Sequence, residues 1–80
     1  MFNRLKEYVK DDEFRLTVFE DRIYATNYQE ILSLEDERIS IHTKKFRIII
    51  KGKNLTLNKL LDKEILISGE VLNIEVSYDW

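Results

Sequence analysis

The chain has 80 residues, a formal net charge of −2 and no cysteine. This length accommodates one modest hydrophobic core, and the lack of cysteine excludes disulfides and thiolate metal sites. With 44% hydrophobic and 35% charged residues, the composition is typical of a folded soluble domain and not of a disordered tail. We therefore expect one domain, residues 1–80, in a cytoplasmic setting.

The N-terminal residues have helical periodicity. Phe2, Leu5, Tyr8 and Val9 are spaced to form one apolar face, which predicts a short amphipathic helix within a helical and acidic segment, residues 1–13. Charged residues interrupt it, so it is neither a signal peptide nor a membrane span. Two interpretations stay open: residues 1–10 dock on a membrane surface or partner, or they cap the β core.

From Phe14 onward the period changes to two, which predicts a β core over residues 14–78. The expected strands are 14–18, 23–26, 31–34, 39–43, 46–51, 55–57, 65–68 and 71–78. No long helix separates them, as parallel crossovers would require. We predict an all-β fold: a small antiparallel β-sandwich or meander of seven to eight short strands, after the N-terminal helix.

A sequence pattern occurs twice in the β core. Ile48-x-Ile50-x-Gly52-x-x-Leu55 is repeated as Ile65-x-Ile67-x-Gly69-x-x-Leu72. We expect both glycines to adopt backbone angles that are forbidden to β-branched residues, at a bulge or sharp bend. The alternative is a short β-solenoid with two rungs, although two copies are few for such a fold. Asn27, Asn54 and Asn58 are expected at strand ends, where their side chains close turns.

Several of these positions together resemble a known family. They are Asn27-Tyr28 followed by Ile31, Ile39-Ser40-Ile41, Ile50-x-Gly52-x-Asn54-Leu55, and Ile65-x-Ile67-x-Gly69 followed by Ile74. In order and spacing they are similar to the YabP/YqfC family of endospore-forming bacteria, over about residues 22–76. The chain departs from the family at two places. Family members often have an acidic residue at the position of Thr26, and they usually have a glycine in the turn that is formed here by Lys44-Lys45-Phe46.

The resemblance implies a sporulation protein of the mother cell, connected with envelope, cortex or spore coat assembly. It further implies a protein partner, for which a membrane protein of the sporulation machinery is the candidate, and no catalytic activity. We therefore expect a non-enzymatic interaction module in the mother-cell cytoplasm. A peripheral position at the forespore membrane is the alternative location. The alternative is a self-assembling β protein that forms filaments or a scaffold.

Catalytic, cofactor and metal sites are not predicted. His42, the only histidine, falls on the face opposite Ile39 and Ile41, and no serine has a nucleophile elbow around it. The acidic runs 11–13 and 35–37 lack the ligand spacing of a calcium loop and are interpreted as solvated charges. The net acidic chain also has no aromatic RNA-recognition signature, so no nucleic-acid partner is expected.

One strand carries a row of cations. Alternation places Lys45, Arg47, Lys51 and Lys53 on the face opposite Phe46, Ile48 and Ile50. These four residues are the candidate partner-binding site, for phosphates, an acidic partner or anionic lipid. The competing interpretation, which we favour, is an outer strand whose lysines prevent sheets from pairing with one another.

Overall fold

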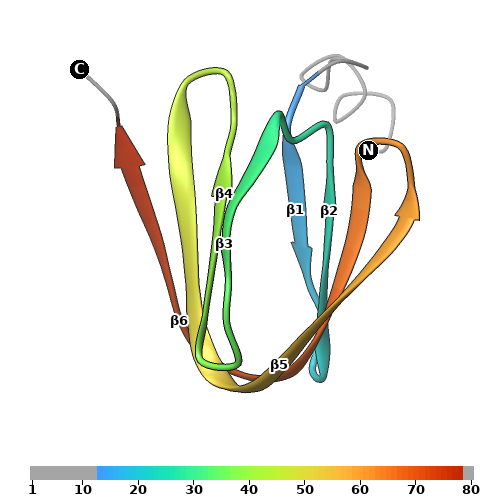
Figure 1. Ribbon diagram of the computed structural model, residues 1–80, viewed down its shortest axis with the longest axis vertical. Helices are drawn as coiled ribbons and strands as arrows, with labels where there is room; N and C mark the ends of the chain where they lie inside the picture. Colours follow the sequence, from blue (N-terminus) through green and yellow to red (C-terminus); the bar gives the residue numbers. More distant parts are fainter. Residues whose placement is uncertain (1–12, 79–80) are drawn as a thin grey trace, which may run out of the picture.

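The computed structural model describes residues 13–78, which form one antiparallel sheet of six strands and contain no helix. The strands are β1 (Arg15–Val18), β2 (Arg22–Thr26), β3 (Glu30–Leu34), β4 (Arg38–His42), β5 (Phe46–Leu61) and β6 (Glu64–Tyr78). Their order across the sheet is β1-β2-β6-β5-β4-β3 (Figure 1). The predicted all-β antiparallel class is confirmed, but not a sandwich of seven to eight strands. The predicted N-terminal helix lies outside the described residues.

The strand number is smaller than predicted because two pairs of expected strands are continuous. β5 runs through Gly52–Asn54 and β6 through Gly69, where we expected breaks. Register shifts between β5 and β6 mark irregularities at these places. Bulges of this kind bend a strand and increase its twist without ending its pairing. The solenoid alternative is wrong, because the strands with this pattern form an antiparallel hairpin.

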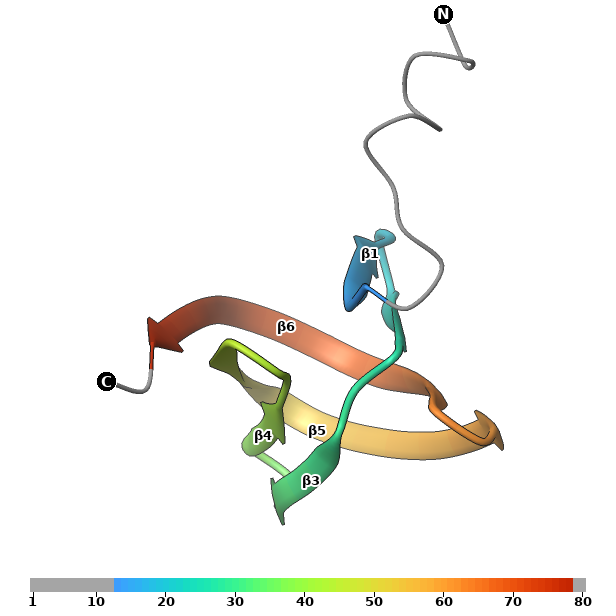
Figure 2. The ribbon, with the colours of Figure 1, turned by 90° about the horizontal axis from the view of Figure 1, so that it is seen from above.

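The long β5–β6 hairpin divides the sheet into two half-sheets. The first half-sheet contains β1, β2, residues 64–68 of β6 and residues 56–61 of β5. The second contains β3, β4, residues 46–51 of β5 and residues 73–78 of β6. Figure 1 shows the hairpin bending at the bottom of the molecule. Figure 2 shows β1 and β3–β4 on opposite sides of the space between the two half-sheets. The sheet is therefore folded over on itself.

The core lies between the two half-sheets and consists mainly of isoleucine. Ile23, Ile65 and Ile67 of the first half-sheet and Ile39, Ile41 and Ile50 of the second have no exposed surface. These β-branched side chains suit a pleated surface, and burying each contributes roughly 1.5–3 kcal/mol. Leu55 at the bend and Tyr28 in the β2–β3 connection belong to the same cluster.

The two glycines at the bend are required for different reasons. Gly69 has a φ of 123°, and a Cβ there would lie 2.6 Å from the carbonyl oxygen of Asn54. Gly52 has no positive φ, but a Cβ would overlap the carbonyl oxygen of Glu70. The expectation of forbidden backbone angles thus holds for Gly69 and is wrong for Gly52, where close backbone approach is the constraint.

Two asparagines have a positive φ, one after β2 and one at the bend within β5. Asn27 has a φ of 62° and Asn54 a φ of 53°, a conformation that asparagine tolerates better than most residues. The Asn27 amide N–H donates to the carbonyl oxygen of Lys63 at 2.8 Å, and its side-chain Nδ2 donates to the carbonyl oxygen of Glu13 at 2.8 Å. Asn27 follows the end of β2, as predicted, but Asn54 and Asn58 both lie within β5, so their predicted places at strand ends are wrong.

The acidic turn between β3 and β4 supports the bend through its backbone. The carbonyl oxygen of Glu37 accepts a hydrogen bond from the Gly52 amide at 3.0 Å, and that of Asp36 accepts one from the Leu55 amide at 2.8 Å. The side chains of residues 35–37 are exposed, as predicted for a solvated charge run. This run therefore has a structural role that its side chains do not indicate.

Candidate interaction surfaces

Two of the four predicted site residues lie on the outward face of the second half-sheet. Arg47 and Lys51 extend from the part of β5 that lies between β4 and β6. Because strands pair with this segment on both sides, it is not an outer strand. The favoured interpretation, that its cations protect a sheet edge, is therefore wrong for these two residues.

The register adds a cation that the sequence pattern missed. Arg38 of β4 lies directly opposite Lys51, and His42 lies opposite Arg47. We call Arg38, Arg47 and Lys51 the cationic face. Like charges directly opposite each other on neighbouring strands destabilise a sheet, so folding alone does not favour this arrangement. The position of Arg38 beside Lys51 follows from the pairing of β4 with β5. Periodicity along one strand does not predict this pairing.

Lys51 also has an anionic neighbour on the other side. Its Nζ lies 3.3 Å from Oε1 of Glu75 on β6, and both side chains are about half exposed, at 48% and 46%. An exposed pair of this kind is worth at most about 1 kcal/mol. Lys51 therefore remains available to a ligand at small energetic cost.

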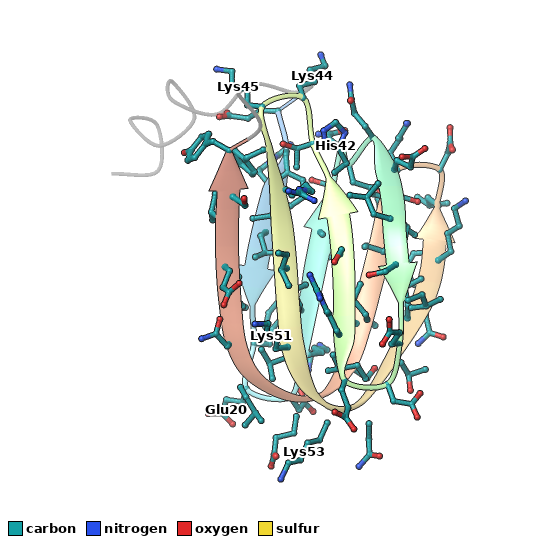
Figure 3. All side chains as sticks on the ribbon, turned by 60° about the vertical axis from the view of Figure 1, so that its left-hand side comes forward. Glu20, His42, Lys44, Lys45, Lys51 and Lys53 are labelled. Atoms are coloured by element: carbon teal, nitrogen blue, oxygen red, sulfur yellow. The ribbon has the colours of Figure 1, made fainter. Side chains whose placement is uncertain are left out.

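The other two predicted site residues are at opposite ends of the half-sheet. Lys45 belongs to the turn between β4 and β5, and Lys53 to the bend (Figure 3). Thr43 builds the turn without a glycine: its Oγ1 accepts hydrogen bonds from the amides of Lys45, at 3.2 Å, and Phe46, at 3.1 Å. The four residues thus form an extended row and not a compact pocket.

A second surface is the outer side of β6. Within residues 13–78, no strand pairs with the side of Asn73–Ser77 that faces away from β5; we call this segment the β6 edge. Val76 lies opposite the buried Ile48 and so is on the inward face, yet it is 51% exposed. Leu72 and Tyr78, next to this edge, are 61% and 53% exposed. The second half-sheet therefore ends in an incompletely covered apolar strand.

The described residues also form two hollows, neither of which includes a residue of the cationic face or of the β6 edge. One, of about 230 Å³, lies between the half-sheets at the end opposite the bend and is lined by Glu13, Phe14, Asn27, Thr43, Lys44, Lys45 and Phe46. The other, of about 340 Å³, lies over the outward face of the first half-sheet. There the hydroxyl of Tyr24 donates to Oε1 of Glu64 at 2.8 Å, and this hydrogen bond raises the pKa of Tyr24.

The described residues contain neither a metal-binding cluster nor a membrane-spanning helix. No three histidine, cysteine or acidic side chains in residues 13–78 are grouped to hold a metal ion. In the same part of the chain, no helix has the length and apolarity needed to cross a membrane. The candidate site for membrane docking, residues 1–10, lies outside the described residues.

Fold and surfaces together define a small antiparallel β domain with a cationic face and an apolar sheet edge. The model of the YabP family matches residues 13–79, which is most of the chain. The chain therefore belongs to the YabP family, as the sequence resemblance predicted. No curated protein and no solved structure gives a significant match. Membership of the YabP family suggests a sporulation-related protein.

Proposed function

We propose that this chain is a non-enzymatic interaction module that works in mother-cell envelope, cortex or coat assembly during sporulation. Family membership supports the connection with sporulation. The observation that carries the binding role is the cationic face, where Arg38 and Lys51 lie opposite each other on adjacent strands. Cations held close together against the stability of the sheet suggest a ligand that neutralises them.

The partner has an acidic surface or segment and belongs to the membrane proteins of the sporulation machinery. The chain as a whole is slightly acidic, with a net charge of −2, while both central strands of the second half-sheet present cations outward. Such a charge distribution orients an acidic partner toward one face. The module then acts in the cytoplasm of the mother cell, at the forespore membrane where its partner is anchored.

Charge reversal tests this proposal. A strain lacking the gene is complemented with Arg38→Glu/Lys51→Glu, or with Lys44→Glu/Lys59→Glu, a control that changes the same charge at exposed lysines outside the cationic face. We expect the first double variant to lose its localisation and to give defective spores, and the control to restore both. Normal spores in the deletion strain, or full complementation by the first variant, would contradict the proposal.

The second candidate function is a self-assembling β protein that forms filaments or a scaffold. The exposed β6 edge favours it, because unpaired strand edges are templates for another chain. Sedimentation over a range of protein concentrations distinguishes the two candidate functions. The particle size of a filament-forming protein increases with concentration, whereas that of an interaction module stays fixed.

A further inference from the structure

The four sheet edges of the described residues differ in how well they resist pairing with another chain. β1 has only four residues, and β3 has a register shift between Ile31 and Ser33. The edge of β5, residues 56–61, has irregular register and carries Lys59 opposite the buried Ile65. Short strands, bulges and inward-pointing charges are the devices that block edge-to-edge pairing.

The β6 edge has none of these devices. Its register with β5 is regular from Asn73 through Tyr78, and Asn73–Ser77 contains no proline, lysine or arginine. Its one charged residue, Glu75, is on the outward face, where it pairs with Lys51. The inward row, formed by Ile74, Val76 and Tyr78, is apolar.

We propose that the β6 edge pairs antiparallel with the β6 edge of a second copy of this chain, across a two-fold axis at Val76. The two second half-sheets then form one continuous sheet. This pairing satisfies the backbone groups on the outer side of β6 and covers the half-exposed Val76. It is separate from the partner-binding role, which uses the cationic face.

Charge and register select the position of the axis. An axis at Glu75 would place the two carboxylates directly opposite each other, which destabilises a sheet. An axis at Ile74 would bring in Leu72, where the register between β5 and β6 shifts. With the axis at Val76, Ile74 lies opposite Tyr78 of the second copy and Glu75 opposite Ser77, so apolar residues face apolar ones and like charges are separated.

The assembly closes at two copies. A two-fold interface uses the same surface of both chains, so pairing consumes both β6 edges. The remaining edges have the blocking features described above, and none is left to extend the sheet. This distinguishes the proposal from a filament, which would need two complementary open surfaces on each chain.

Single cysteines test the register, because the chain has none of its own. Val76→Cys is compared with Leu34→Cys, a control matched in strand position and exposure. Leu34 lies on the outer strand β3, opposite the buried Ile39. Its exposed fraction is 58%, against 51% for Val76. On mild oxidation we expect a disulfide-linked dimer from Val76→Cys at least tenfold faster than from Leu34→Cys. Equal rates for the two variants would overturn the proposal.

Sedimentation of the full chain gives the second measurement. We expect a dimer of the 9.7 kDa chain at tens of micromolar, with a dissociation constant raised at least tenfold by Val76→Lys and unchanged by Leu34→Lys. A monomer throughout, or polymers that grow with concentration, would refute the closed dimer. Neither result would bear on the charge-reversal experiment, so failure here is distinguishable from failure of the proposed partner binding.

Discussion

β5 and β6 have equivalent arrangements in the fold, but the side chains of their edge parts differ. Each begins as a central strand, passes a glycine at the bend, and continues as an edge strand of the other half-sheet. The repeated sequence pattern with Gly52 and Gly69 corresponds to this shared path. Yet the edge part of β5 carries an inward lysine, Lys59, while that of β6 carries valine and isoleucine. Equivalent positions in the fold are thus protected on one strand and exposed on the other.

This difference shows that topology alone does not determine which surfaces interact. Both edges have one side without a strand in the described residues, but an inward charge would be buried by pairing at the β5 edge. The β6 edge has no such penalty. A few side chains therefore decide which end of the same hairpin is able to bind another strand.

The largest expected effect contrasts the two parts of β6. Ile67→Asp buries an unpaired carboxylate in the core, which costs several kcal/mol and should unfold a domain of this size. Val76→Asp, on the half-exposed edge part of the same strand, should cost about 1 kcal/mol or less. Urea unfolding followed by circular dichroism measures both. Similar losses would mean that the edge part is as essential to the core as the central part.

The glycines at the bend give the next largest effect. Gly52→Val and Gly69→Val should each lower the free energy of unfolding by more than about 1 kcal/mol, the centre of single-substitution effects. The reason is overlap with the Glu70 carbonyl for Gly52, and overlap with Asn54 together with a positive φ for Gly69. Thr56→Val, at an exposed position just after the bend, is the control and should change little. Wild-type stability in either glycine variant would contradict the geometry of the bend.

Removing the protection of β5 should make the two edges alike. Lys59→Val replaces the inward charge with a residue that favours strands, so we expect new concentration-dependent association beyond the dimer, with little change in stability. Lys44→Val removes a lysine from a turn and controls for the lost charge. Light scattering measures the association. If both variants scatter equally, Lys59 has no protective role.

The smallest effect concerns alkaline pH. The hydrogen bond from Tyr24 to Glu64 raises the pKa of Tyr24 in the folded state. Its contribution to stability is therefore fully present below the unfolded-state pKa of about 10 and is lost as pH rises through the higher folded-state value. Tyr24→Phe should show a weaker decrease in stability above pH 10 than the wild type. Identical pH profiles for wild type and Tyr24→Phe would contradict this linkage.

Local patterns predicted the strands well and their continuity poorly. Alternation located every strand of the described residues, because a half-buried strand needs apolar residues at every second position. It placed breaks at Gly52–Asn54 and Gly69, because glycine and asparagine mark both turns and bulges, and the sequence does not distinguish them. Whether a strand continues depends on its partner, here the other long strand of the same hairpin.

The candidate site was predicted in part for a related reason. The row of cations on β5 follows from a period of two, but its position between β4 and β6 follows from pairings between distant segments. Arg38 was missed because only the register places it beside Lys51. The β6 edge was missed because the expected strand 71–78 gave no indication of which side would lack a neighbour.

The pairing of β2 with β6 has a consequence for how the chain folds. β3, β4 and β5 each pair with the next strand in sequence, so the second half-sheet assembles from local hairpins, whereas Ile23 of β2 pairs with Ile67 near the far end of the chain. Contacts this distant form slowly, because a large loop must close first. During synthesis, β1 and β2 must wait for β6 to emerge, with Ile23 and Ala25 uncovered. The β1–β2 hairpin is therefore the segment most exposed to misassociation before folding is complete.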